Sequence, residues 1–128
     1  MIDFKAFLRA CDAPFSPADN NCFTAAIAAY PYSERVAKLA NWWRNESAAR
    51  RTKLNYANLV LIADGFAQEL GFSAAIDSTP TGREIGIATG AGLSPTMCVG
   101  ANGSWFARGT RGAMRIPNRY IVRSWVVE

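Results

Sequence analysis

The fold is decided by the stretch Asn21-Cys22-Phe23-Thr24-Ala25-Ala26-Ile27-Ala28-Ala29-Tyr30. Its apolar residues recur at intervals of three and four, which is the period of an α-helix. It is rich in alanine and carries no charged side chain, which indicates burial on most sides. Pro31 ends the helix, and the preceding polar run Asp19-Asn20-Asn21 offers N-cap residues. Cys22 is therefore predicted to lie in the first turn of a buried helix.

Three other helices are predicted in the first half of the chain. Residues 3–10 place Phe4, Phe7 and Leu8 at helical spacing, and Ser33 can cap a helix that runs through Trp43. The polar stretch 44–53 is expected to be exposed. Residues 55–70 form the clearest helix, ended by Gly71, with a predicted core stripe of Leu59, Ile62, Ala63, Phe66 and Leu70.

The second half of the chain is rich in predicted strands. After Gly82 the apolar period changes to two, and strands are predicted at 84–89, 96–100, 104–107, 113–116 and 120–127. Asn102-Gly103 is a pair that type I′ turns require, so the strands around it should form an antiparallel hairpin. In the last strand, alternation places Ile121, Trp125 and Val127 on one face. We expect a single α+β domain over residues 1–128, helical in 1–72 and strand-rich in 82–127.

Composition sets limits on the class of protein. The chain has 128 residues, of which 50% are hydrophobic and 19% charged, as in an ordinary globular domain. Its apolar runs are too short to cross a bilayer, so no membrane span is expected. The charges at Asp3, Lys5 and Arg9 interrupt the first ten residues, so we expect a soluble protein made without a secretory signal.

The net charge of +4 favours acidic partners such as nucleic acid or an acidic protein surface. The basic residues are scattered, however, and only Arg50, Arg51 and Lys53 form a tight cluster. A solvated face is the preferred interpretation, and binding to a polyanion is the alternative.

The sequence contains no histidine and three cysteines, Cys11, Cys22 and Cys98, without a Cys-x-x-Cys pair. A zinc site would lack its usual ligands, so we expect no metal and no cofactor. The cysteines are interpreted as reduced thiols.

Four segments resemble the NlpC-type cell-wall peptidases, which have a papain-like fold. Residues 21–26 resemble their Asp-Cys-x-x-Phe segment, and Thr81-Gly82-Arg83-Glu84-Ile85 resembles their Pro-Gly-Asp-Leu strand start. Residues 96–103 resemble their Gly-Ile-Tyr-Leu-Gly-Asn-Gly hairpin, and residues 112–126 resemble their closing strands. A small family of phage proteins, often encoded among tail genes, is similar in its early cysteine, central hairpin and closing Trp-Val strand. The resemblance covers about residues 7–127.

The resemblance implies N-terminal helices packed on a C-terminal antiparallel sheet, with a cysteine nucleophile and a histidine base from the sheet. Here the place of the histidine falls at Ser94, the residue that would orient it falls near Ala107, and Asn21 replaces the aspartate. Serine and alanine cannot act as a general base near neutral pH. Cys22 is therefore interpreted as a vestigial nucleophile.

The preferred hypothesis is a non-catalytic phage virion protein, made in the host cytoplasm and located in or near the tail. Its partners would be other virion proteins or further copies of the chain. Trp42 and Trp43 cannot both lie on one helix face, so one is predicted to be exposed as a partner anchor. With Arg50 and Arg51, these tryptophans are the candidate binding residues.

Two alternatives remain open from the sequence. One is a cell-wall peptidase or amidase with Cys22 as nucleophile and Glu84, Asp77 or Asp64 as an unconventional base. The other, weaker one is a basic protein associated with nucleic acid.

Overall fold

The structure is a computed structural model that describes residues 1–14, 21–49, 56–75, 79–90 and 93–127. For residues 21, 47–49, 56–59, 90, 93 and 94 it describes the backbone alone. Helices come first in the chain: α1 (Phe4–Asp12), α2 (Asn21–Ala29), α3 (Glu34–Ala49) and α4 (Tyr56–Glu69). Strands follow: β1 (Ser73–Ala74), β2 (Glu84–Gly90), β3 (Leu93–Ala101), β4 (Ser104–Gly109), β5 (Gly112–Ile116) and, after the 3-10 helix η2 (Asn118–Tyr120), β6 (Ile121–Val126).

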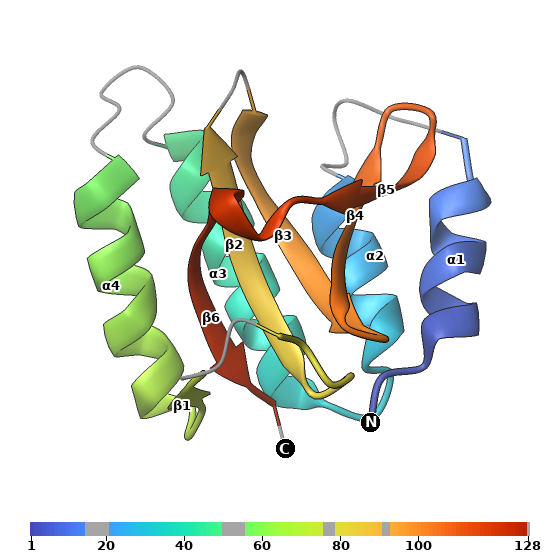
Figure 1. Cartoon of the computed structure of the whole chain (residues 1–128). Coiled ribbons are helices and arrows are strands. Elements are labelled where there is room, and N and C mark those ends of the chain that lie inside the picture. The colour runs from blue at the N-terminus through green and yellow to red at the C-terminus, as the bar shows by residue number, and fades with distance from the viewer. Residues whose placement is uncertain (15–20, 50–55, 76–78, 91–92, 128) are drawn as a thin grey trace.

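The strands form one antiparallel sheet in the order β1-β6-β2-β3-β4-β5. Figure 1 shows α2 and α3 behind this sheet, with α4 beside β6 and α1 beside β5. Since β5 lies at one edge and β6 near the other, the η2 link crosses the sheet on the face away from α2 and α3. The protein is therefore of the α+β class, as predicted.

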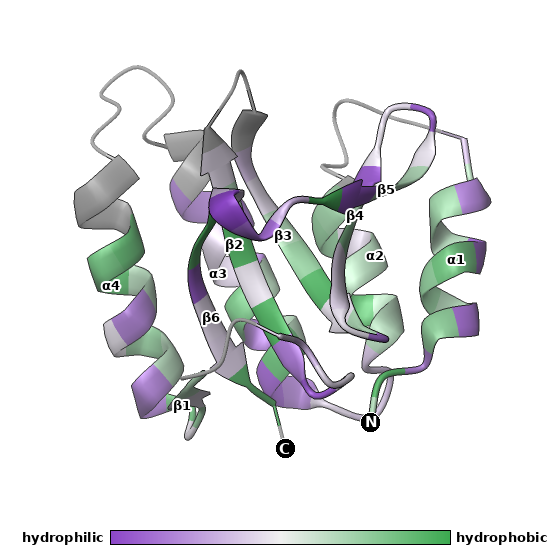
Figure 2. Ribbon diagram, viewed as in Figure 1, coloured by the Kyte–Doolittle hydropathy of each residue, from purple (hydrophilic) through white to green (hydrophobic). Residues whose placement is uncertain are grey.

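Each face of the sheet carries its own apolar cluster. The helix-facing cluster includes Phe23, Val36, Ile87, Met97 and Trp125. Figure 2 shows hydrophobic residues in green along β2 and β3, the two middle strands that contribute to this cluster. A second, smaller cluster covers the opposite face and consists of Ala88, Cys98, Trp105, Ala107 and Ile116, with Met114, Tyr120 and Ile121 packed against it. The η2 link thus serves as the cover of the second cluster.

At the helix ends, Ser33 and Gly71 act as predicted, and Asp3 is a further N-cap that was not predicted. The Asp3 carboxylate accepts a hydrogen bond from Ala6 N–H at 3.0 Å, and the Ser33 hydroxyl accepts one from Val36 N–H at 3.2 Å. Gly71 takes a positive φ of 89°, and Phe72 N–H binds the Ala67 carbonyl at 3.0 Å beyond the end of α4.

The hairpin turn is confirmed as well. Asn102 and Gly103 both have positive φ, at 52° and 79°, and Ala101 pairs with Ser104 across the turn.

Two details of the helix prediction are wrong. Helix α3 continues to Ala49 through part of the polar stretch, where the Arg44 guanidinium donates to the Asn41 side chain at 2.6 Å. Ile62 is 44% exposed, because α4 packs through the neighbouring small residues Ala63 and Ala67. In α1, Leu8 is 38% exposed, whereas its neighbour Phe7 is buried in the core.

The last strand also differs from simple alternation. Ile87 pairs with Arg123 but Ala88 pairs with Ile121, so β6 holds one extra residue at a bulge. The bulge moves Ile121 to the second cluster, while Trp125 and Val127 remain in the helix-facing cluster. The prediction that all three share a face is therefore wrong for Ile121.

The close approach of Pro80 to Gly100 gives a test of this packing. A Cβ on Gly100 would overlap the Pro80 ring and contact the Glu84 carboxylate, whereas a Cβ on Gly65 in α4 would meet nothing within 4 Å. We expect Gly100→Ala to lower the free energy of unfolding by at least about 2 kcal/mol through overpacking. Gly65→Ala should leave it unchanged or raise it by up to about 1 kcal/mol. Urea denaturation measures both, and an equal effect of the two substitutions would contradict this packing.

Candidate functional site

The candidate site is built around Cys22, which lies in the first turn of α2 as predicted. Helix α2 packs on β3 and β4, and the Cys22 side chain is half-buried against the helix-facing cluster. Backbone N–H groups of Met97, Phe23 and Cys22 itself lie near the sulfur and favour its thiolate form. The thiol is thus surrounded by the helix start and the middle of β3.

Burial raises the pKa of the Cys22 thiol above its ordinary value, and the three backbone N–H groups offset only part of this effect. The neutral thiol is therefore the stable form at neutral pH. A nucleophilic cysteine needs the opposite, a thiolate favoured by a base or a cation.

By the resemblance to the NlpC-type peptidases, the place of their histidine base falls at Ser94, and the place of the residue that orients it falls near Ala107. Ser94 lies on β3, where the register against β2 shifts between Ala88 and Gly90, and its side chain lies outside the described residues. Ala107 is fully buried in the second cluster, on the face of the sheet away from Cys22. An orienting group at Ala107 would therefore face the wrong side.

Glu84, one of the alternative bases, also lies on the other face. It alternates with Ile85 of the helix-facing cluster, and its carboxylate points toward Gly100 and Pro80. Glu84 is only 7% exposed. Its carboxylate accepts hydrogen bonds from Thr81 N–H at 2.9 and 3.0 Å and from the Thr81 hydroxyl at 2.7 Å. It also accepts from Gly82 N–H at 3.2 Å and from Arg83 N–H at 2.9 Å. These bonds assign Glu84 to the turn before β2, not to Cys22.

Of the two aspartates considered as bases, Asp64 and Asp77, the structure describes only Asp64. Asp64 of α4 accepts a hydrogen bond from the Trp125 indole N–H at 2.9 Å and another from Gln68 at 3.4 Å. Its carboxylate therefore anchors α4 to β6. Asp77 lies outside the described residues.

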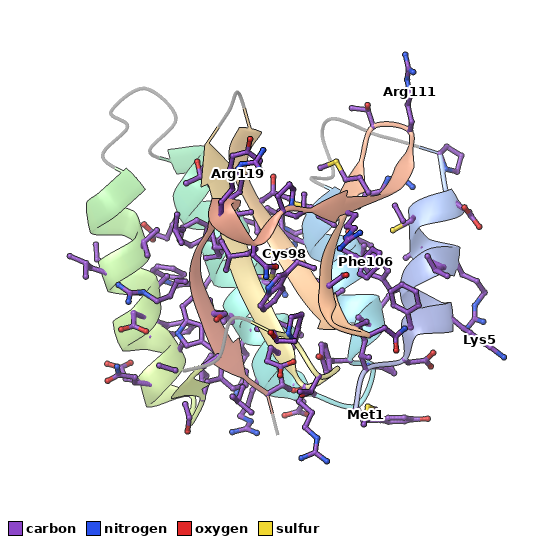
Figure 3. All side chains as sticks on the ribbon, in the orientation of Figure 1. Met1, Lys5, Cys98, Phe106, Arg111 and Arg119 are labelled. Carbon is purple, nitrogen blue, oxygen red and sulfur yellow. The ribbon has the colours of Figure 1, made fainter. Side chains whose placement is uncertain are left out.

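The other thiols are packing residues. Cys11 and Cys98 are buried, and all three cysteines are free. Burial raises the pKa of both, and nearby Cys22 raises that of Cys98 further; Cys98 is labelled within the sheet in Figure 3. Within the described ranges, no cluster of three or more potential metal-binding side chains occurs.

The candidate binding residues divide into two groups. Trp43 is fully buried, and its indole N–H is buried without a hydrogen-bond acceptor. Trp42 is half-buried and stacks on Phe66 of α4 with ring centroids 5.2 Å apart, so neither tryptophan is an exposed anchor. Arg50 and Arg51 lie outside the described residues.

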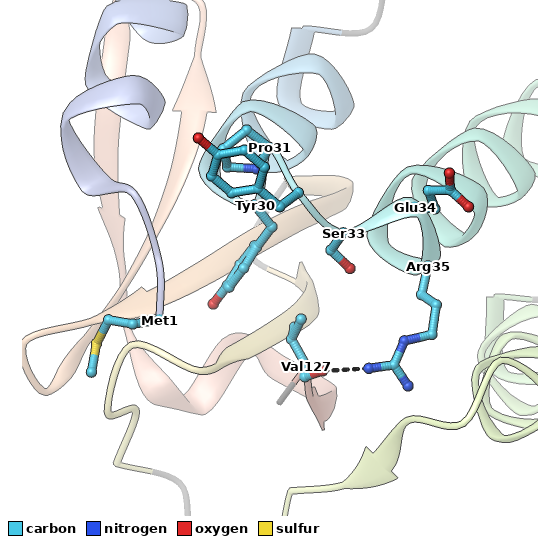
Figure 4. Close-up of a pocket in the computed structure, with 8 residues that line it drawn as sticks. Met1, Tyr30, Pro31, Ser33, Glu34, Arg35 and Val127 are labelled. Atoms are coloured by element: carbon cyan, nitrogen blue, oxygen red, sulfur yellow. Dashed lines mark hydrogen bonds between the residues drawn. The ribbon is translucent and has the colours of Figure 1, made fainter.

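A hollow of about 480 Å³ lies at the other end of α2, away from Cys22 (Figure 4). Arg35 at its wall donates to the carbonyl oxygens of Val127 at 3.0 Å and of Leu70 and Gly71 at 3.3 Å. Its guanidinium is thus engaged by the fold. The hollow is lined by Met1, Tyr30, Pro31, Tyr32, Ser33, Glu34, Arg35 and Val127.

No family model, no curated protein and no solved structure matches the chain significantly. In the part of the chain that the structure describes, no helix combines the length and the apolar character needed to cross a membrane.

The role of Glu84 in the turn can be tested by Glu84→Gln. The amide nitrogen of glutamine is a donor, and since Thr81 N–H contacts both carboxylate oxygens, that nitrogen faces the Thr81 N–H in either orientation; the turn also loses the negative charge that its N–H groups bind. We expect the free energy of unfolding to fall by about 1–3 kcal/mol. Glu69→Gln, at an exposed position near the end of α4, is the matched control and should change it by less than about 0.5 kcal/mol. Urea denaturation measures both variants, and an equal loss of unfolding free energy in the two would contradict the role of Glu84 in the turn.

The protonation of Cys22 can be tested by alkylation with iodoacetamide, followed residue by residue by mass spectrometry. Because its pKa is raised, less thiolate is present at a given pH than in an ordinary cysteine, and the rate should keep rising above pH 9. At pH 7.5 we expect native Cys22 to react about tenfold or more slowly than the same residue in the urea-unfolded chain. A native rate equal to or above the unfolded rate would contradict the raised pKa.

Proposed function

We propose that the protein is a non-catalytic structural or assembly component of a phage virion, built on a degenerate cysteine-peptidase scaffold. The observation that carries the non-catalytic part is the environment of Cys22, whose pKa is raised by burial and which faces backbone N–H groups instead of a base. The chain has no histidine that could supply one.

The positions of the carboxylates support the same proposal. Glu84 lies on the opposite face of the sheet and is held by its own turn, and Asp64 is bonded to Trp125. Neither is placed to accept a proton from Cys22 in the described structure. Hydrolysis also needs a proton donor for the leaving amine, which a lone thiol does not provide.

We further propose that the fold is a papain-like, NlpC-like one. Its support is the order of the elements: a cysteine in the first turn of a buried helix, packed on the third strand of a later antiparallel sheet. The four resembling segments fall on the start of α2, the turn into β2, the β3–β4 hairpin and the strands β5 and β6. Assignment to a virion, and to its tail, rests on the resemblance to the phage family.

Peptidoglycan turnover tests the catalytic part of the proposal. We expect purified protein to release no soluble muropeptides from cell-wall sacculi above the level of a buffer blank, because Cys22 lacks a base. Cys22→Ser should behave identically. Turnover that disappears in Cys22→Ser but persists in Cys11→Ser would establish a cysteine hydrolase and overturn the proposal.

Particle composition tests the virion part. We expect mass spectrometry of purified phage particles to find the chain at a fixed stoichiometry relative to known tail subunits. Abundant chain in infected cells together with its absence from the particles would contradict a structural role in the virion.

A further inference from the structure

The turn between β3 and β4 contains the one Asn-Gly pair of the sequence, Asn102-Gly103. Both residues are exposed, and both have positive φ. Because glycine has no Cβ, no side chain shields the Gly103 backbone nitrogen from the amide group of Asn102. The side chain of asparagine can therefore react with that nitrogen more readily here than before any larger residue.

The reaction is an intramolecular cyclisation that needs only water as a co-reactant. The Gly103 nitrogen loses its proton and forms a bond to the side-chain carbonyl carbon of Asn102. The bond from that carbon to the amide nitrogen breaks, and the amide nitrogen leaves with the proton as ammonia. Water then opens the resulting succinimide at either carbonyl, which gives aspartate or isoaspartate. Isoaspartate adds a methylene group to the backbone of the turn.

The fold holds the Gly103 nitrogen in a position that opposes this reaction. Its N–H donates to the Pro80 carbonyl at 3.0 Å, so the nitrogen must lose a hydrogen bond before it can lose its proton. The φ of 52° also places Asn102 in the left-handed region. That conformation turns the Gly103 nitrogen to the side of the Cα–C bond opposite Cβ, whereas ring closure needs the two on the same side.

Pro80 is itself fixed by its neighbours. It is fully buried, and its ring packs on Gly100 of β3. The three residues that follow it, 81–83, donate their backbone N–H groups to the Glu84 carboxylate. Figure 1 shows the segment that leads into β2 beside the β3–β4 turn. The Pro80 carbonyl is thus a rigid acceptor, and Gly103 reaches the reactive geometry only when the two segments separate.

We propose that Asn102 is a site of spontaneous deamidation that the fold keeps closed through the Pro80 carbonyl. Separation of segment 79–84 from the turn frees the Gly103 nitrogen and allows Asn102 to leave the left-handed region. The rate of deamidation in the folded protein therefore measures how often this contact opens. The inference does not depend on the proposed virion role.

The test follows deamidation at pH 8 and 37 °C by mass spectrometry of the tryptic peptide 84–108, in which Asn102 is the only amide side chain. Labelling with an isoaspartyl methyltransferase identifies the isoaspartate product. We expect the native chain to deamidate at least about tenfold more slowly than the chain unfolded in guanidinium chloride, because reaction in the fold requires a local opening.

Two variants separate the Pro80 contact from overall stability. Pro80→Ala removes the part of the ring that packs on Gly100, and the control Val60→Ala removes the same number of carbon atoms from a buried position in α4, which packs on β1 and β6. We expect Pro80→Ala to speed deamidation of the folded chain by at least about fivefold and the control by less than about twofold. Thermal unfolding shows whether each variant is folded at 37 °C. Should Pro80→Ala not fold, Glu84→Gln loosens the same segment and should act in the same direction.

Equal rates in the native and the unfolded chain would overturn the proposal, because the fold would then give no protection. Equal acceleration in Pro80→Ala and Val60→Ala would overturn it as well, since protection would then come from overall stability. If the unfolded chain forms neither aspartate nor isoaspartate at Asn102, the assignment of the site is wrong.

Discussion

The packing of α2 on the sheet is the constraint on which the rest of the structure depends. Ala25, Ala26 and Ala29 are at most 1% exposed, and their small side chains allow the helix to lie close to β3 and β4. Helices α1 and α3 then pack on α2 from either side. The end of the helix is fixed too, because the Ala29 carbonyl accepts from Asp3 N–H at 2.8 Å and the Tyr30 hydroxyl donates to the carbonyls of Gly82 and Glu84 at 3.3 Å.

This packing also sets the chemistry of Cys22. A helix start usually favours a thiolate through its positive end and its unpaired N–H groups. Here the close approach of α2 to β3 removes water from the sulfur, and the cost of burying a charge exceeds what the N–H groups return. The sheet then separates Cys22 from Glu84, which lies on the opposite face. Burial against the sheet therefore outweighs the effect of the helix start on the pKa of this thiol.

The sequence predicted what local periods and turns control, and missed what packing between elements controls. The first turn of α2, the Ser33 cap and the Asn102-Gly103 turn each depend on a few adjacent residues, and all were predictable. The face of Ile121 depends on a bulge in β6, and the exposure of Ile62 depends on α4 packing through alanines instead of its larger side chains. For the candidate site, the lack of a histidine base could be read from residue types alone. That Glu84 is held by Thr81–Arg83 could not, because nothing in the local pattern says which donors a buried carboxylate will meet.

The crossing segment between β4 and β6 shows how one stretch can serve the core and still present charge. In β5 the side chains alternate: Met114 and Ile116 turn toward the second cluster, while Ala113 and Arg115 are exposed. Tyr120 also packs against the second cluster, and its ring lies under the guanidinium of Arg119. The inward residues alone cover the cluster, so the outward positions are free of any packing requirement. Packing in the second cluster therefore does not require arginine at these outward positions.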